Sequence, residues 1–232
     1  MRRSYDLEIL DDPHHDAAEL ERSLDQVADV NRWLGGDRAL RRTLAPLLTV
    51  PGTVRLLDVG AGNGEVALAV ARWAAEHGRR WQVAALDLHA QTAALAARRA
   101  RAAGPGAGVS VLRGDGLRLP FADRSVDVAF TVLTLHHFRE EPAVLLLREM
   151  ARVARRLVVV NDLERNRPAW LGARALAATV WRGNRITRND GPLSVRRSFT
   201  PAELLALAER AGLRNARVRR RVAFRLVLEA EP

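Results

Sequence analysis

The strongest constraint on this chain is a glycine-spaced turn at residues 56–64, whose letters are LLDVGAGNG. An apolar run over residues 54–57 precedes the turn and a helical pattern over residues 65–76 follows it, which gives the order strand, tight turn, helix. Glycine lets the backbone bend sharply and approach a ligand closely because it has no Cβ. The helix that follows presents unpaired N–H groups at its N-terminus. The segment therefore predicts a site for a nucleotide-like ligand.

The spacing of the glycines decides which ligand is expected. A dinucleotide fingerprint, G-x-G-x-x-G, needs a glycine at position 65, where this chain has Glu65. The glycines are instead Gly60, Gly62 and Gly64, and Asp58 stands two residues before the first of them. This spacing resembles motif I of class I S-adenosylmethionine (SAM)-dependent methyltransferases. A nicotinamide enzyme is therefore the weakest alternative.

A second stretch, GDGLRLPFADRSVDV at residues 114–128, strengthens this resemblance. It is similar to the GD…LPF.D.SFD.V signature of the methyltransferase group that includes quinone- and sterol-modifying enzymes. The resemblance implies that Asp115 and the following backbone hold the adenine ring. Asp87 ends the second predicted strand, where an acid accepts hydrogen bonds from ribose hydroxyls in nucleotide-binding α/β folds. The predicted cofactor-binding residues are Asp58, Gly60, Ala61, Gly62, Asn63, Gly64, Asp87, Leu88, Asp115, Gly116, Leu117 and Thr131.

Candidate catalytic residues follow the fourth and fifth predicted strands. The letters TLHHF at 134–138 resemble the LHHF of small-molecule methyltransferases, and the (N/D/S)-P-P-(Y/F) segment of exocyclic-amine methyltransferases is absent. His137 or His136 can act as a general base, because a histidine pKa lies near neutrality; the alternative is that one packs under the cofactor and the other caps a helix. Asp162 can be a base or orient a hydroxyl. Arg165 can hold an anionic oxygen, or pair with Asp162 to fix the loop.

Composition narrows the choice further. The chain has no cysteine, which excludes disulfides, thiolate zinc sites, iron–sulfur clusters and a cysteine nucleophile, and we predict no metal site. The net charge is +10, but all 37 basic residues are arginines interleaved with acids, so a nucleic-acid partner is disfavoured. Only residues 214–225 form a dense basic run. No apolar segment of membrane-spanning length and no signal peptide is visible, so a cytoplasmic location is the expectation.

The order of elements predicts a Rossmann-like, doubly wound seven-stranded mixed sheet with a C-terminal antiparallel hairpin. We expect an N-terminal helical cap over residues 1–50 and a methyltransferase domain over residues 51–232, with the insert 163–199 as a substrate lid. Within these regions, residues 1–13 are expected to form a loosely held arm and residues 182–199 a polar loop. Trp33, Trp170 and Trp181 are predicted to contact the acceptor. Strands are predicted at 54–57, 81–86, 109–112, 126–133, 157–160, 216–221 and 223–229.

These patterns together predict a SAM-dependent methyltransferase acting on a small molecule. The segments VNRWLGG, VVVNDLERNR and NDGPLSVRRSFTPAEL resemble a subgroup of quinone-methyltransferase-like bacterial enzymes associated with polyketide pathways. The implied acceptor is a hydroxyl, or a carbon, of a phenolic, quinone or polyketide-derived compound. Two alternatives stay open: an RNA methyltransferase that uses the basic run, and a non-catalytic SAM-binding regulatory protein. The sequence does not predict the oligomeric state.

Overall fold

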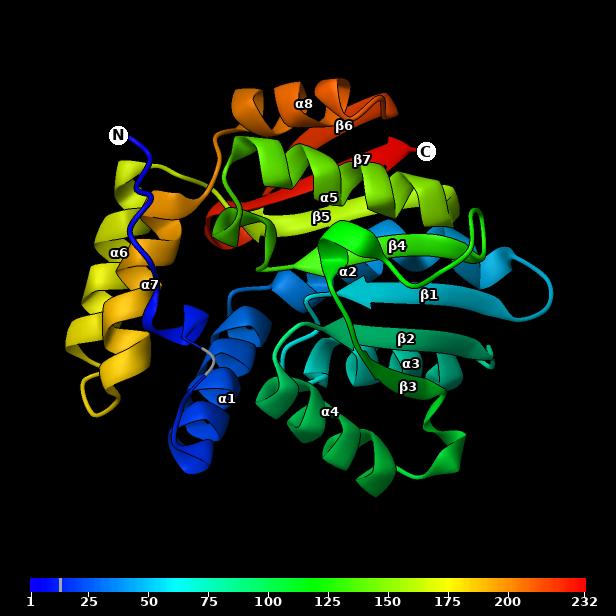
Figure 1. Cartoon of the computed structure of the whole chain (residues 1–232), viewed down its shortest axis with the longest axis horizontal. Coiled ribbons are helices and arrows are strands. Elements are labelled where there is room, and N and C mark those ends of the chain that lie inside the picture. The colour runs from blue at the N-terminus through cyan, green and yellow to red at the C-terminus, as the bar shows by residue number, and fades with distance from the viewer. Residues whose placement is uncertain (13) are drawn as a thin grey trace.

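One seven-stranded sheet organises the computed structural model, which describes residues 1–12 and 14–232. The strand order is β3-β2-β1-β4-β5-β7-β6, and β7 runs antiparallel to both of its neighbours (Figure 1). This is the predicted doubly wound sheet with its C-terminal hairpin. The strands are β1 (Val54–Val59), β2 (Trp81–Asp87), β3 (Val109–Arg113), β4 (Val126–Val132), β5 (Ala154–Leu163), β6 (Arg214–Arg221) and β7 (Arg225–Glu231).

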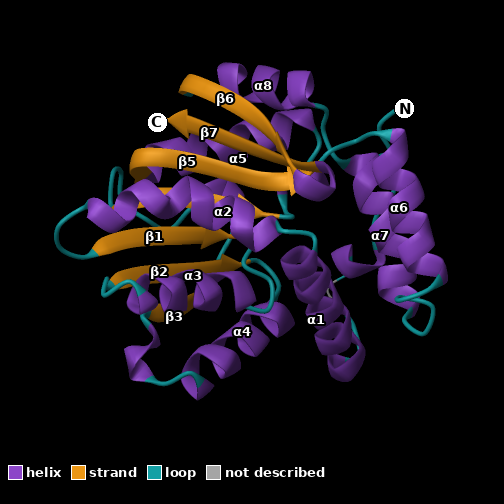
Figure 2. Cartoon of the chain, turned by 180° about the vertical axis from the view of Figure 1, so that it is seen from behind, coloured by secondary structure: helices purple, strands orange, loops and turns teal. Residues whose placement is uncertain are grey.

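Helices cover both faces of the sheet. Figures 1 and 2 show α5 and α8 on one face and α2 and α3 on the other, while α4 packs beside β2 and β3. Three further helices, α1, α6 and α7, stand beyond the carboxyl ends of the parallel strands. The helices are α1 (Ala17–Trp33), α2 (Gly36–Leu44), α3 (Glu65–Glu76), α4 (Ala90–Ala102), α5 (Glu140–Val153), α6 (Arg167–Ala178), α7 (Arg185–Arg197) and α8 (Pro201–Arg210).

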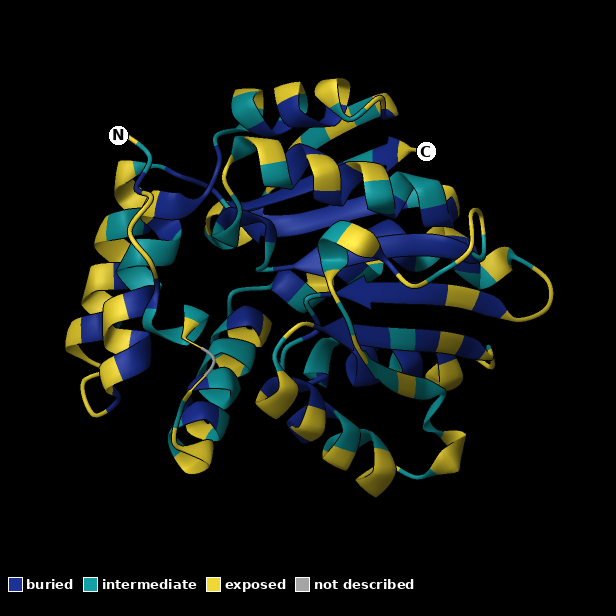
Figure 3. Cartoon of the chain, viewed as in Figure 1, coloured by how far each residue is buried: buried dark blue, intermediate teal, exposed yellow. Residues whose placement is uncertain are grey.

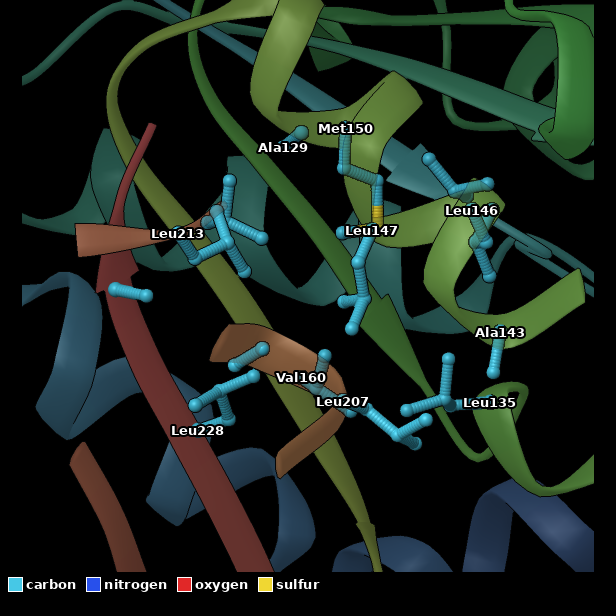
Figure 4. Close-up of a cluster of buried hydrophobic side chains, with 14 of the residues drawn as sticks. Ala129, Leu135, Ala143, Leu146, Leu147, Met150, Val160, Leu207, Leu213 and Leu228 are labelled. Carbon is cyan, nitrogen blue, oxygen red and sulfur yellow. The ribbon is translucent and has the colours of Figure 1, made fainter. Parts of the chain in front are cut away.

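The core fills the two layers between sheet and helices. Every residue of β4 is buried, as expected for a central strand that is covered on both faces (Figure 3). Figure 4 shows one layer, in which Leu147 and Met150 of α5 meet Leu207 of α8 above Val160 and Leu228 of the sheet. This packing makes the sheet a rigid platform for the residues at its carboxyl edge.

Residues 182–199 were predicted to be a polar loop, and this prediction is wrong. Residues 185–197 form α7, which begins where the Asn184 side chain accepts from the backbone N–H groups of Ile186 and Thr187. The segment contains few apolar residues because its buried side includes polar groups such as Asp190, which are paired with other elements. The prediction relied on apolar residues at helical spacing, but α7 is held in place by polar side chains that pair with other elements.

The prediction of a loosely held arm is also wrong over residues 1–12; Pro13 lies outside the described residues. The segment runs alongside α7 (Figure 1) and contains a short 3₁₀ turn, η1 (Ile9–Asp11). The Arg3 guanidinium donates to the carbonyl oxygen of Phe138 at 2.7 Å, and the Ser4 N–H donates to the carbonyl of Arg196 at 3.0 Å. Glu8 is only 4% exposed. These contacts bring Glu8, Asp11 and Arg3 of the arm to the carboxyl edge of the sheet.

Candidate active site

The glycine turn connects β1 to α3 in the predicted position. Gly60, Gly62 and Gly64 all have left-handed φ angles, of +75°, +56° and +79°. A Cβ at Gly60 would lie 2.3 Å from the Thr134 side chain, so this glycine allows β1 and the segment after β4 to approach closely. A Cβ at Gly62 would have only one neighbour, a Leu24 methyl carbon at 4.0 Å. Gly62 therefore borders open space, as a ligand-facing position in such a turn requires.

Asp87 at the end of β2 fastens the turn. One of its carboxylate oxygens accepts from the Gly62 N–H at 2.9 Å and the other accepts from the His89 N–H at 3.0 Å. Burial raises the pKa of Asp87 despite these hydrogen bonds. Each carboxylate oxygen has a further lone pair, so the residue can hold the turn and still accept from ribose hydroxyls.

Asp58 ends β1 beneath the turn and has an unusual environment. Its side chain is 1% exposed, and Oδ2 has no hydrogen-bond partner among the described residues. Burial, followed by the nearby charge of Asp87, raises the pKa of Asp58 to about 8. A buried carboxyl without a partner is costly unless a cation or donor reaches it. SAM carries a sulfonium and an ammonium group, so this donor set fits that cofactor.

The residues predicted to hold adenine lie in a short 3₁₀ turn, η4 (Gly116–Arg118), after β3. Asp115 is exposed, and its Oδ1 accepts from the Leu117 N–H at 2.8 Å. A Cβ at Gly116 would lie 3.0 Å from carbons of Val59 and Leu146, so the turn sits tightly against the end of β1 and on α5. This places the predicted adenine residues next to the glycine turn.

Three other predicted cofactor residues have different surroundings. Thr131 is fully buried, and its hydroxyl donates to the Val59 carbonyl at 2.7 Å, so it links β4 to β1. The Asn63 amide donates to Asp25 of α1 at 3.0 Å, which ties the turn to the N-terminal helix. Leu88 is half exposed after β2. Contact of these residues with the cofactor stays a prediction.

The two histidines lie in η5 (Leu135–His137), directly after β4. The Nδ1–H of His136 donates to Asp162 Oδ1 at 2.7 Å, and the backbone N–H of His136 donates to Asp162 Oδ2 at 3.0 Å. The Nδ1–H of His137 donates to Asp11 Oδ1, also at 2.7 Å. The two rings lie 4.4 Å apart. The structure thus brings together three of the four predicted catalytic residues and adds Asp11 from the N-terminal segment.

Glu8 and Arg197 complete this group, which we call the histidine cluster: Glu8, Asp11, His136, His137, Asp162 and Arg197. Glu8 Oε1 lies 3.7 Å from His136 Nε2, and Oε2 lies 3.9 Å from His137 Nε2. Arg197 of α7 donates to Asp11 at 2.5 Å and to the His137 carbonyl at 2.7 Å. No motif in the sequence marks Glu8, Asp11 or Arg197, because each comes from a segment predicted to be an arm or a loop.

Burial and charge set the protonation states in the histidine cluster. Burial alone would lower the pKa of His137, but Glu8 and Asp11 outweigh it and raise that pKa to about 9. Burial would raise the pKa of Asp162, but the charge and hydrogen bonds of His136 hold it below its ordinary value. The pKa of Asp11 is likewise lowered against burial, by His137 and Arg197. With its pKa of about 9, His137 is a cation at pH 7.

Arg165 and the three tryptophans do not join the histidine cluster. The buried Arg165 forms an ion pair with Glu203 at the N-terminus of α8, so the expected pairing with Asp162 does not occur.

Trp33 ends α1 and is 75% exposed. Trp181 is buried against Gly191 of α7, where a Cβ would lie 2.2 Å from its ring. Trp170 is partly exposed, with the Arg174 guanidinium 5.0 Å from its ring centre.

Comparison with known proteins identifies the fold first. A SAM-dependent methyltransferase from Aquifex aeolicus superposes with a TM-score of 0.67, at 20% identity, over 94% of this chain and 98% of that one. The seven-stranded sheet of this chain therefore has the Rossmann-like fold of methyltransferases. Among the described residues, no helix combines the length and apolarity needed to cross a bilayer.

Sequence similarity then identifies the domain. Residues 56–156 match the family model described as a methyltransferase domain. A demethylmenaquinone methyltransferase from Roseiflexus sp. strain RS-1 is 34% identical over 137 residues, which cover 58% of this chain and 52% of that protein. The protein of the same name from Roseiflexus castenholzii is 30% identical over 69% of this chain and 66% of that protein. The chain therefore carries a SAM-dependent methyltransferase domain that is similar to those of these quinone methyltransferases, and it spans about half to two thirds of the length of these relatives.

Proposed function

We propose that this chain transfers a methyl group from SAM to a hydroxyl, or a carbon, of a small quinone, phenolic or polyketide-derived acceptor. One observation carries the proposal most directly: the glycine turn adjoins the histidine cluster, and the charge of His137 acts on Asp87, which holds the turn. The Thr134 side chain links the two, because it packs on Gly60 and its hydroxyl donates to the Gly60 carbonyl at 3.2 Å. The relatives named demethylmenaquinone methyltransferase favour a quinone-derived acceptor.

SAM supplies an activated methyl on its sulfonium, so the main task of the protein is alignment. The acceptor atom must lie in line with the S–CH₃ bond at about 3–3.5 Å. Asp87 and the backbone of the glycine turn would hold the ribose and methionine end, and Asp115 with the η4 backbone the adenine. Asp58 would face the positive charge of the cofactor. The domain division, with a cap at 1–50 and a lid at 163–199, is part of this proposal.

The acceptor hydroxyl also has to lose a proton. A phenol has a pKa of roughly 10 in water, by analogy with tyrosine, so it is mostly protonated at pH 7. We assign His136 and Asp162 to this step, because they form a buried hydrogen-bonded pair at the carboxyl edge of the sheet. The protonated His137, whose ring lies 4.4 Å from that of His136, would stabilise the negative oxygen that forms. Arg165 is less suited to this step, because its ion pair with Glu203 neutralises its charge. Positioned acid–base groups of this kind contribute about 10²–10⁴-fold to rates.

The test is transfer of radiolabelled methyl from SAM to a panel of quinols, phenols, amines and RNA. We expect label in a quinol or phenol, and a fall of at least tenfold in kcat for Asp162→Asn. His89→Ala, which changes a histidine outside the cluster, is the control. Saturable SAM binding with no transfer to any acceptor would instead favour the regulatory alternative, and label in RNA would favour the RNA methyltransferase.

A further inference from the structure

Both histidines of the cluster point the same ring nitrogen, Nε2, toward the carboxylate of Glu8. Asp162 and Asp11 each accept from an Nδ1–H at 2.7 Å. In a neutral imidazole with a protonated Nδ1, the Nε2 carries a lone pair and can only accept. Both Nε2 atoms lie near Glu8, which also has only lone pairs to offer. Three acceptors facing one another are stable only if a cation, either a proton or a metal ion, lies between them.

Glu8 supplies an independent sign that this cation site is incomplete. Its side chain is 2% exposed, and Oε1 has no hydrogen-bond partner among the described residues. The Arg197 Nε is 3.6 Å from that oxygen, which is too long for a hydrogen bond. A buried carboxylate oxygen aimed at two imidazole nitrogens is therefore left without a donor.

We propose that Glu8, His136 and His137 bind one divalent first-row transition-metal ion, with Zn²⁺ as the best fit. The ligand atoms of these three residues all lie within 4.8 Å of one another. An ion at about 2.0–2.2 Å from each ligand needs them roughly 3.3–3.6 Å apart. Glu8 Oε1 is 3.7 Å from His136 Nε2 and Glu8 Oε2 is 3.9 Å from His137 Nε2, and no two ligand atoms are more than 4.8 Å apart, so closure requires side-chain shifts of about 1 Å or less.

The surroundings match those of metal-bound histidines in proteins. Such histidines donate their second N–H to a carboxylate, which fixes the tautomer and makes the ligand nitrogen more basic. Here both histidines do so. One carboxylate oxygen with two imidazoles is a donor set that suits zinc, while magnesium and calcium prefer oxygen alone.

The charge around the site also accepts a cation. Glu8, Asp11 and Asp162 carry three negative charges when ionised. Arg197 contacts Glu8 and Asp11, and the charge of the buried Arg225 interacts with that of Asp162. With neutral histidines the five groups leave one net negative charge, and a bound divalent ion would change this net charge from −1 to +1.

Metal binding would have a structural consequence. Glu8 belongs to the N-terminal segment and the histidines to η5, so the ion would fasten that segment over the carboxyl edge of the sheet. Three protein ligands leave at least one coordination position for water or for an acceptor oxygen. That last role rests on the proposed function, whereas metal binding does not. With the ion bound, the Nε2 lone pairs of both histidines would be occupied, so neither ring would then act as the base. The proposal departs from the sequence-based expectation of no metal site, because Glu8 has no place in a local ligand motif.

The experiment measures metal binding by the untagged full chain without SAM or acceptor. The protein is treated with a chelator, dialysed, and titrated calorimetrically with Zn²⁺, and bound metal is counted by elemental analysis. We expect one Zn²⁺ per chain. Glu8→Gln and His137→Ala should each weaken binding by more than tenfold, and Asp11→Asn by about 10–100-fold, as for other outer partners of metal-bound histidines.

Matched controls separate the proposed site from adventitious surface binding. His14→Ala and His77→Ala remove exposed imidazoles and should leave affinity and stoichiometry unchanged. Circular dichroism checks that each variant folds, and the half-exposed His137 provides a test if Glu8→Gln does not fold. Absence of binding overturns the proposal, as does binding that survives His137→Ala. Because methyl transfer is not the readout, a failed metal site and a failed methyltransferase proposal are distinguishable.

Discussion

At the scale of single residues, Asp58 is the most informative group. Its position was predicted from the glycine spacing, but its protonation state depends on burial that no local sequence pattern reveals. Burial raises its pKa to about 8, so the free protein holds a neutral carboxyl there at pH 7. Binding of a positively charged cofactor favours the ionised form.

Cofactor binding should therefore release protons. We expect SAM binding at pH 7 to release up to one proton per chain, because Asp58 ionises beside the cofactor charge. Calorimetric titration in two buffers of different ionisation enthalpy measures this number. Asp58→Asn should bind more weakly and release fewer protons. A binding enthalpy that is the same in both buffers would contradict the role given to Asp58.

The same residue should shape the pH dependence of stability. The folded-state pKa of about 8 exceeds the ordinary value of 3.8, so the native state binds more protons than the unfolded state between these values. Stability of the free protein should then fall as pH rises from about 4 to 8. Asp58→Asn should reduce this slope and have the higher Tm at pH 8. Thermal unfolding at several pH values checks it, and parallel curves for the two proteins would argue against the raised pKa.

The burial of Glu8 could not be predicted from the sequence. His136, His137 and Asp162 could be found because each follows a predicted strand, and parallel strands end at one edge of a sheet. Glu8 and Asp11 precede the first helix in a polar segment, where nothing local indicates burial. Their burial depends on Arg197 of α7, an element whose own pattern was misleading.

At the scale of elements, α7 holds the N-terminal segment in place. Asp190 of α7 accepts from the N–H groups of Ile9 and Leu10, both at 2.9 Å, with one carboxylate oxygen each. These are the free N–H groups at the start of η1, so Asp190 caps that turn from another element. The capped turn in turn places Glu8 and Asp11 against the histidines.

Removal of this cap should loosen the segment without unfolding the sheet. We expect Asp190→Ala to cost about 2 kcal/mol, the scale of hydrogen bonds to a charged group, and to speed amide hydrogen exchange in residues 1–12. Arg188→Ala, at an exposed position of α7, is the matched control and should leave exchange unchanged. Equal protection of residues 1–12 in the two variants would show that Asp190 does not hold the segment.

At the scale of the whole molecule, the sheet order follows from the sequence because its causes are local and repeated. Apolar strands alternate with amphipathic helices, and Gly64 starts α3 where the turn predicts it. The packing of α7 against α1 was harder to predict, because polar pairs join these two helices. Examples are Ser23 with Asn184, and Thr187 with Gln26. Such pairs have no sequence period, so the position of the glycine turn could be predicted from the sequence and the position of α7 could not.

Calorimetry with SAM tests most directly whether the glycine turn of this fold binds the cofactor. We predict saturable one-to-one binding by the native chain and a loss of at least tenfold in affinity for Gly62→Val, whose side chain would enter the open space beside the turn. Gly52→Val carries similar strain, since Gly52 also has a left-handed φ and no near neighbours, and it should bind SAM normally. Absence of SAM binding by the native chain, or equal binding by both variants, would contradict the account.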